Sequence, residues 1–269
     1  MCDKTGTLYD NLERCASEYP VAVSAKPFSS VWTRERKGPR DQGLSRDQIV
    51  RAAMELLDED GLDALSMRKL GARLGAGATS LYWHVANKDE LLELVMDKVY
   101  AKVSIPEGSS WHDAATAFAY GMRDAVSQHR WSISLIGVLP ALGPNAMTAA
   151  DRLMAAFSSA GFDGIDVDYA VTAVVSYTLG ATIPEVVWLD ALDEAGTDVA
   201  GIQASMGPLI EELGADYPSL QERYRAYDDM AFDPMTARRI AFDFGLVALL
   251  DGLAARLPHG SRRDHPVSD

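Results

Sequence analysis

Cysteine is scarce in this chain, and the two thiols present, Cys2 and Cys15, both lie near its start. Two cysteines so placed give no disulfide framework, so a reducing cytoplasm is the expected setting. Residues 1–20 carry acidic groups throughout and no apolar core, which argues against a signal peptide. No uncharged apolar run approaches the roughly 20 residues of a membrane span, so we expect no membrane partner.

Motifs for catalysis are missing as well. The chain has no glycine-rich phosphate loop, no set of four metal ligands and no plausible catalytic triad. His112 and His129 do not show metal-ligand spacing to each other. An enzyme is therefore a minor alternative, and we expect neither a cofactor nor a metal. Internal repeats and a strand pattern are also absent, which favours an all-α fold.

Charge is distributed unevenly along the 269 residues, whose formal net charge is −14. Residues 1–43 hold 7 Lys and Arg against 6 Asp and Glu, and residues 44–103 hold 8 against 10. Residues 104–269 hold 10 against 23, which is a net charge of −13. An acidic C-terminal part repels nucleic acid, so it helps to orient the N-terminal part toward DNA. The length and the 48% hydrophobic content fit a folded chain of two domains.

Residues 45–103 have the pattern of four consecutive helices. Ser45 and Gln48 form a capping-box pattern, and Gly61 follows the last turn of this first helix. The fourth helix begins at Asn87 and runs to about Val103. The apolar stripe of the first helix is Ile49, Ala53, Leu56 and Leu57.

Between the first and the fourth helix lie two short helices joined by the glycine-rich turn 75–77. Ser66 caps the first of the two, and its buried side is Leu70 and Leu74. The second covers roughly residues 79–85 and is too short to be stable alone. We therefore expect Leu81 and Val85 to hold it against the other helices.

This short helix carries an unusual run of side chains, Tyr82-Trp83-His84, with Lys88 just beyond it. Hydroxyls, aromatic rings and an imidazole on one short helix suit contacts with a phosphate backbone and base edges. Each of the three has an alternative role. Tyr82 could be a core aromatic with its hydroxyl at the rim, and His84 could cap or pack locally. Trp83 could mainly act as a wedge that holds the helix in place.

The phrase Leu81-Tyr82-Trp83-His84-Val85, followed by Asn87-Lys88, resembles the DNA-binding domain of the TetR (tetracycline-repressor-like) family of repressors. Order and spacing agree from Ser45 to Val103 without gaps, and weaker counterparts continue to about Leu257. The resemblance implies a three-helix helix-turn-helix domain, double-stranded operator DNA as partner, and a helical ligand-binding and dimerisation domain.

The resemblance and the side-chain chemistry together give a set of candidate DNA contacts. Arg68 matches a base-contacting arginine of the family, with a solvated helix face as the alternative. Ala78 and Thr79 stand where close relatives have glutamine and proline; Ala78 cannot hydrogen-bond a base, so a different operator is expected. The candidates within the domain are Arg68, Thr79, Ser80, Tyr82, Trp83, His84 and Lys88.

A basic arm lies in the flexible extension that we expect over residues 1–44. Between Lys26 and Arg40, just before the first helix, the basic residues stand against Glu35 alone. Such arms reach the minor groove in homeodomains, whereas the alternative is a solubilising leader without DNA contact. The arm residues proposed to contact DNA are Arg34, Arg36, Lys37 and Arg40.

The sequence pattern of the C-terminal part predicts long helices over residues 111–128, 144–159, 166–192 and 234–257. The acidic stretch over residues 195–229 is expected to be partly mobile. The last helix has an apolar seam. Two of these helices have excess apolar surface, which indicates more than one packing partner. The resemblance implies a homodimer through a four-helix bundle, and the alternative places both helices in the monomer core. The seam is Ile240, Phe244, Val247, Leu250 and Leu253.

Aromatic and methionine side chains in this part suit a large hydrophobic effector. Taken singly, a residue of this type is more often part of a plain core than of a pocket lining. The histidines with which family members hold magnesium are replaced, one of them near Ile136, so magnesium and tetracycline are not expected. The candidates for ligand binding are Phe118, Met122, Trp131, Leu135, Leu139, Met154, Phe157, Tyr177, Glu185 and Trp188.

The sequence thus predicts an all-α, cytoplasmic, homodimeric transcriptional repressor that a hydrophobic small molecule releases from a pseudo-palindromic operator. The expected divisions are a flexible extension (1–44), a helix-turn-helix domain (45–103), a ligand-binding and dimerisation domain (104–257) and a disordered tail (258–269). A regulator without an inducer is the main alternative, ahead of a helical adaptor or an enzyme. An efflux or biosynthesis gene is the expected target.

Overall fold

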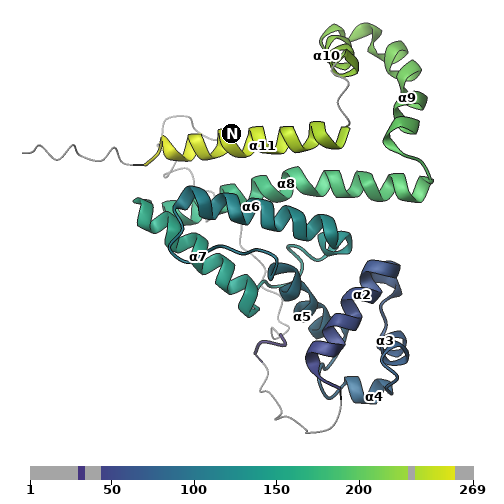
Figure 1. The fold of residues 1–269 in the computed structure, drawn as a ribbon, viewed down its shortest axis with the longest axis vertical. Helices are drawn as coiled ribbons and strands as arrows, with labels where there is room; N and C mark the ends of the chain where they lie inside the picture. The colour runs from purple at the N-terminus through teal and green to yellow at the C-terminus, as the bar shows by residue number, and fades with distance from the viewer. Residues whose placement is uncertain (1–29, 34–43, 230–233, 258–269) are drawn as a thin grey trace, which may run out of the picture.

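The computed structural model describes residues 30–33, 44–229 and 234–257, and the elements assigned within them are all helical (Figure 1). This confirms the predicted all-α class. The N-terminal elements are α2 (Arg46–Ala64), α3 (Met67–Arg73), α4 (Ala78–Leu81) and α5 (Lys88–Tyr100). The C-terminal elements are α6 (Trp111–Gln128), the 3-10 helix η1 (Arg130–Ser134), α7 (Pro144–Ala160), α8 (Ile165–Ala195), α9 (Val199–Leu213), η2 (Gly214–Asp216), α10 (Pro218–Asp229) and α11 (Pro234–Ala254).

Side-chain caps start the N-terminal helices where the sequence predicts them. Ser45 Oγ accepts the Gln48 N–H at 3.1 Å, and Gln48 Oε1 accepts the Ser45 N–H at 2.8 Å. Ser66 and Asn87 each accept the main-chain N–H three residues on. Gly61 adopts φ +77°, where only glycine is free of strain, and the main chain leaves helical geometry there. These local rules fix the length and direction of α2 and α3.

The first hydrophobic core binds α2, α3, α4 and α5 together. Ile49, Leu70, Leu81 and Val85 are all fully buried in it. The same core also includes Ala125, Trp131 and Leu135, which come from α6 and from the segment that contains η1. The N-terminal helices therefore share their core with residues far along the chain, beyond the predicted boundary at residue 103.

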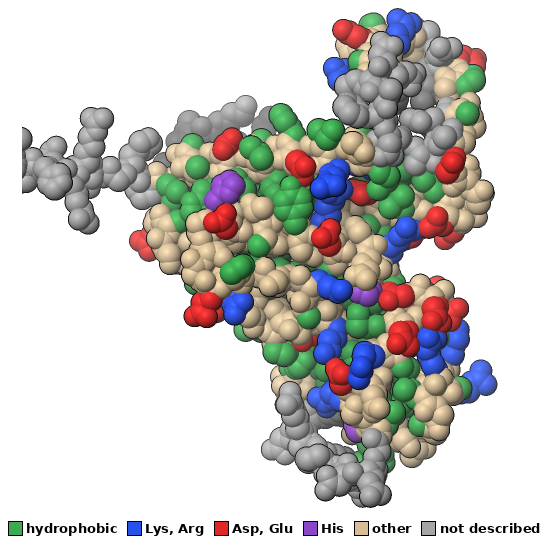
Figure 2. All heavy atoms as spheres, in the orientation of Figure 1, with side chains coloured by type: hydrophobic (Ala, Val, Ile, Leu, Met, Phe, Trp, Pro, Cys, Tyr) green, Lys and Arg blue, Asp and Glu red, His purple; other side chains and the backbone are tan. Residues whose placement is uncertain are grey.

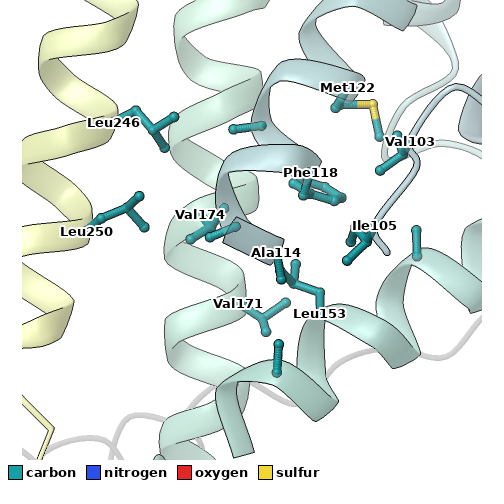
Figure 3. Packing of buried hydrophobic residues seen from close by; sticks show 14 of the residues in the cluster. Val103, Ile105, Ala114, Phe118, Met122, Leu153, Val171, Val174, Leu246 and Leu250 are labelled. Atoms are coloured by element: carbon teal, nitrogen blue, oxygen red, sulfur yellow. The ribbon is translucent and has the colours of Figure 1, made fainter. Parts of the chain in front are cut away.

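The second core lies among α6, α7, α8 and α11 (Figure 3). Phe118 of α6 and Leu153 of α7 face Val174 of α8, and Leu250 reaches in from α11. Close approach of α11 depends on Gly245, because a Cβ there would lie 2.4 Å from Tyr177 Oη. Burial of these side chains supplies the main stabilisation of this part.

The third predicted helix, over residues 79–85, is shorter in the structure. α4 spans Ala78–Leu81 and is followed by a turn in which the Val85 N–H bonds to the Leu81 carbonyl at 3.1 Å. Leu81 and Val85 are fully buried, so tertiary packing holds this turn in place. Similarly, α5 ends at Tyr100, before the predicted Val103.

Residues 195–229 contain α9, η2 and α10, where the sequence predicts an interrupted, partly mobile stretch. Figure 1 shows these helices projecting from the end of α8 before the chain returns as α11. The predicted seam of α11 divides into two faces. Leu250 and Leu253 are buried, whereas Ile240, Phe244 and Val247 are exposed.

Helix α8 is long and apolar enough to cross a membrane by length and composition alone. Asp166, Asp168 and Glu185 interrupt its apolar run, so the uncharged stretch in the sequence is shorter than the helix. In the structure, α8 packs against α6, α7 and α11. A helix in the core of a soluble protein can have the same length and composition. Because α8 packs against three other helices, we interpret it as a core helix.

Candidate DNA-binding interface and ligand-binding core

The turn between α3 and α4 places α4 at the surface. Gly75 adopts φ +61°, and the Ala76 N–H bonds back to the Gly71 carbonyl at 2.9 Å. The Ser80 N–H bonds to the Gly77 carbonyl at 2.9 Å and closes the first turn of α4. This α3–turn–α4 arrangement is a helix-turn-helix geometry.

Helix α4 and the turn after it have one buried and one exposed side. Leu81 and Val85 are fully buried, while the Tyr82 and Trp83 side chains between them are 50% and 53% exposed. Thr79 and Ser80 are exposed at the start of the helix. Folding explains the two aliphatic residues but gives no reason for large aromatic rings at the surface, so this exposed side is the candidate interface.

His84 is half-buried at the end of the same turn. Arg46 Nη2 donates to the His84 carbonyl oxygen at 3.1 Å, which connects this turn to the start of α2. Burial, and then the nearby Arg46 charge, lower the pKa of His84 from its usual value. The imidazole is therefore neutral near pH 7 and offers a hydrogen bond rather than a charge.

Cations near this surface differ in how they are engaged. On the face shown in Figure 2, basic and acidic side chains are interleaved over α2 and α3. Arg73 pairs with Glu59 at 2.6 Å, and Lys69 pairs with Asp60 at 2.8 Å. Arg68 is exposed on α3, and the contacts among the described residues leave it unpaired. It is thus open to an external anion or base edge.

Lys88 is half-buried, and its Nζ donates to the Leu62 carbonyl oxygen at 3.2 Å. The bond satisfies a carbonyl near the Gly61 break in α2, a role that the sequence did not indicate. An ammonium group has three donors, so this bond leaves it able to donate to a phosphate as well.

The basic residues proposed as an arm, Arg34, Arg36, Lys37 and Arg40, lie outside the described residues. Within the same extension, however, residues 30–33 form a turn, so the prediction of a flexible extension was wrong for these four. Val31 is buried in the N-terminal core, and Ser30 Oγ and the Val31 N–H both donate to Glu93 of α5. This anchor has no local sequence signal, because a bond between positions 31 and 93 depends on the fold.

The ten ligand-binding candidates do not form one cluster. Phe118, Met122 and Phe157 are buried in the core of α6, α7, α8 and α11. Tyr177, Glu185 and Trp188 lie along α8, beside or near α11. The remaining candidates lie elsewhere: Trp131, Leu135 and Leu139 belong to the N-terminal core or pack on it, and Met154 is exposed.

Polar groups within the core cluster around an ion pair. Arg123 of α6 bonds to Glu185 of α8 at 2.9 Å, and both side chains are largely buried. The Arg123 guanidinium also lies 4.6 Å from the centre of the Phe242 ring on α11. Tyr177 Oη donates to the Phe242 carbonyl oxygen at 2.7 Å. These contacts place a small set of paired polar groups inside an otherwise apolar core.

A small hollow, with a cavity volume of about 20 Å³, lies between α5 and the loop before α7. Leu135 and Leu139 line it together with Glu93 and Asp97 of α5, which the sequence analysis missed. Asp97 accepts the Asn145 N–H at 2.9 Å and caps α7. The signal for these acids was their spacing of four residues on the apolar side of α5. No group of three or more potential metal ligands occurs in the described part of the chain.

Comparison with known proteins gives consistent matches over both parts of the chain. Residues 49–95 match the N-terminal region of bacterial regulatory proteins of the tetR family, and residues 105–257 match the tetracyclin repressor-like C-terminal domain. An HTH-type transcriptional regulator of Saccharopolyspora erythraea is 42% identical over 200 residues, which cover 73% of this chain and 82% of that protein.

Two further matches extend the comparison. The class A tetracycline repressor from transposon 1721 in Escherichia coli is 31% identical over 218 residues, which are 79% of this chain and 92% of that protein. The crystal structure of the Streptomyces coelicolor TetR family protein ActR in complex with actinorhodin has a TM-score of 0.62 and 29% identity, with coverage of 80% of this chain and 98% of that one.

Proposed function

This chain belongs to the TetR family of bacterial regulatory proteins and is a DNA-binding transcriptional regulator, and we propose that a hydrophobic small molecule releases it, as a homodimeric repressor, from a pseudo-palindromic operator. Its relatives are named as regulators, in agreement with the expectation that the chain is not an enzyme. We further propose that the regulated gene encodes an exporter or a biosynthetic enzyme.

The exposure of Tyr82 and Trp83 between two fully buried residues carries the DNA part of this proposal. The Tyr82 hydroxyl suits a phosphate contact, and Trp83 packs against the sugar-phosphate surface or steadies the helix. Thr79 and Ser80 lie exposed at the start of α4, where their hydroxyl groups suit contacts with phosphate or base edges. Together these groups position α4 in the major groove.

Further DNA contacts are proposed for four groups around α4. Arg68 reaches a base edge, with guanine as the preferred partner of its planar guanidinium. His84 contributes a neutral hydrogen bond, and Lys88 a phosphate contact beside its bond to Leu62. The basic residues Arg34, Arg36, Lys37 and Arg40 add contacts in the flanking minor groove.

Dimerisation through α8 and α11 follows from their second apolar faces. Ile240, Phe244 and Val247 recur at a spacing of four and three residues on α11, opposite its buried residues. On α8, Tyr169 and Val187 are similarly exposed. Figure 2 shows hydrophobic side chains along the surface formed by these two helices. A second copy of the chain covers both faces in a four-helix bundle, and supplies the second recognition helix that operator specificity requires.

The effector binds in the core of α6, α7, α8 and α11. Phe118, Met122 and Phe157 provide apolar walls, and the Arg123–Glu185 pair provides polar groups that orient a ligand. ActR, which has a similar fold, is in complex with actinorhodin. We infer an effector of comparable type for this chain, a polycyclic hydrophobic compound, without a metal.

Selection of bound fragments from genomic DNA tests the DNA-binding proposal. Full-length protein should enrich a pseudo-palindromic sequence, and Tyr82→Phe should weaken binding to it without a change in Tm. Tyr217→Phe is the matched control, because Tyr217 is exposed on the projecting segment away from α4. Equal effects of both substitutions, or no enriched sequence, would refute the role of α4.

Titration of the operator complex with actinorhodin tests the effector proposal. Release should correspond to a coupling of about 1–3 kcal/mol, and operator DNA should weaken effector binding by the same factor. Tight binding of the compound with unchanged DNA affinity would favour the alternative, a regulator that this class of small molecule does not induce.

A further inference from the structure

A turn of the N-terminal extension, residues 30–33, is built into the first hydrophobic core. Val31 is buried in the core that also holds α4 and the turn after it, which we call the recognition turn (residues 78–85). Trp32 packs against the same core. The family match over residues 49–95 does not include the turn of the extension, so its role has to come from the structure.

Ser30 shapes this turn and also holds it on α5. Its carbonyl oxygen accepts the Thr33 N–H at 3.2 Å, and its Oγ accepts the Trp32 N–H at 3.2 Å. The same hydroxyl donates to Glu93 Oε2, and the Val31 N–H donates to that oxygen at 3.2 Å. Two donors of the turn therefore converge on one carboxylate oxygen of α5.

Glu93 depends on the turn for its hydrogen bonds. Its side chain is buried, and among the described residues its carboxylate makes no ion pair and accepts bonds from Ser30 and Val31 alone. Loss of the donors of a buried carboxylate is unfavourable, because a charge is then left without a partner in apolar surroundings. Release of the turn would consequently drive Glu93 toward water and shift α5.

Helix α5 begins where the recognition turn ends. Asn87 Oδ1 caps α5 by accepting the Glu90 N–H at 2.8 Å, and Glu90 Oε2 accepts the Ala86 N–H at 2.8 Å. Glu93 follows Glu90 by three residues, so it lies on the same side of α5 and about 4.5 Å further along its axis. A rotation or shift of α5 at Glu93 therefore reaches Ala86 and the recognition turn directly before it.

We propose that Ser30, Val31 and Glu93 form an anchor that holds α5 in the position that the recognition turn needs in order to bind the operator. The extension then contributes to DNA binding through the fold as well as through the charges of its basic residues. This role of the anchor rests on the proposed function, in which α4 enters the major groove. All three are positioning residues, and none of them is proposed to touch DNA.

Hydrogen exchange of the full-length protein without DNA tests the anchor apart from the proposed function. The double variant Ser30→Ala/Val31→Ala should release the turn of the extension. The amides of His84 and Val85 should then exchange roughly tenfold faster, because their bonds to the Leu81 carbonyl close the recognition turn. Amides within α2 should change far less, whereas simple destabilisation of the domain would affect them equally.

Variants of Glu93 approach the anchor from the other side. Glu93→Met removes the acceptor but keeps an unbranched side chain, so it should reproduce the double variant. Glu93→Gln keeps an oxygen that can accept both bonds, and its exchange should stay close to that of the wild type. Two controls should leave the Val31 amide protected. Val23→Ala/Ser24→Ala makes the same two changes elsewhere in the extension, and Asp97→Asn alters another buried carboxylate of α5, whose donors come from α7.

Operator affinity separates the anchor from the basic residues of the arm. Ser30→Ala/Val31→Ala should weaken operator binding roughly tenfold, because the binding-competent position of the recognition turn is then less populated. The same loss should persist, with an unchanged salt slope, when the four basic residues of the arm are already glutamine. An affinity loss that disappears in that background would show that the turn acts through the charges of the arm.

Three exchange results would overturn the anchor. They are a Val31 amide that stays protected in both Ser30→Ala/Val31→Ala and Glu93→Met, unchanged exchange of His84 and Val85 after release of the turn, and an equal loss of protection in α2. Absence of any selected operator would refute the proposed function. Exchange of His84 and Val85 would still decide, in that case, whether the anchor positions the recognition turn.

Discussion

The Arg46 guanidinium donates to the main-chain carbonyl oxygen of His84 at 3.1 Å, and so ties the first turn of α2 to the end of the α4 turn. Burial of the imidazole, and secondarily the Arg46 charge, hold the pKa of His84 below its usual value. The folded protein therefore resists protonation of His84, whereas the unfolded chain titrates near pH 6.5.

This relationship predicts how stability depends on pH. Between the lowered pKa of the folded state and about 6.5, the unfolded state binds more protons, so the contribution of His84 is fully present above pH 6.5 and lost as the pH falls. When the pH is lowered from 7.5 to 5.5, the Tm of the wild-type protein should decrease more than the Tm of His84→Gln. Arg46→Met should reduce the difference only in part, because burial is the larger cause. A greater loss in His84→Gln would contradict this explanation.

Arg68→Ala should relax sequence specificity at one base pair of each half-site, by roughly 1–3 kcal/mol. The reason is that Arg68 is exposed on α3 and unpaired among the described residues, whereas its neighbour Lys69 is engaged with Asp60. Affinities for operators with single substitutions would measure the effect, with Lys69→Ala as the control. A uniform loss for all sequences would identify Arg68 as a phosphate contact instead.

The basic residues of the extension should contribute to the salt dependence of DNA binding. Replacement of Arg34, Arg36, Lys37 and Arg40 by glutamine should flatten the slope of affinity against salt, by up to about four phosphates per arm. Substitution is preferable to deletion of residues 1–40, because Val31 and Ser30 are buried against α5. An unchanged slope would show that the arm leaves DNA untouched, and dimerisation should be unaffected in either case.

Phe244→Glu should convert the protein to a monomer at micromolar concentration. The Phe244 side chain is 76% exposed in the single chain, at the centre of the second apolar face of α11, so a charge there would be buried in the dimer. Sedimentation would detect the change. Val138→Glu is the matched control, since Val138 is 73% exposed on the loop after η1. A dimeric Phe244→Glu variant would place the interface elsewhere.

Local chemistry made the helix starts predictable. Ser45, Ser66 and Asn87 act through hydrogen bonds within three residues, and Gly161 ends α7 with φ +105°. The division of the α11 seam was not predictable, because Ile240, Phe244 and Val247 are apolar but exposed, whereas Leu250 and Leu253 are buried. An apolar pattern indicates which side chains are buried, but it does not indicate whether the same chain or a second copy buries them.

The candidate interface was predictable from the run of residues 82–84, since exposure follows from one-turn spacing between Leu81 and Val85. Contacts between distant parts of the chain were not predictable from the sequence. Glu93 holds Ser30, Arg123 holds Glu185, and Asp58 holds Trp131. Each pairing requires the helices to be assembled first, and Trp131 was consequently assigned to the effector core although it lies in the N-terminal one.

Titration of full-length protein into a selected operator, and into a duplex with a single half-site, tests the proposed function most directly. Two protomers should bind the full operator, with half-site centres on the order of 34–36 Å apart or a multiple of that distance. The half-site should bind far more weakly, because only one α4 can reach a major groove. A single protomer on the full operator, or equal affinity for both duplexes, would contradict a dimeric repressor that reads DNA through α4.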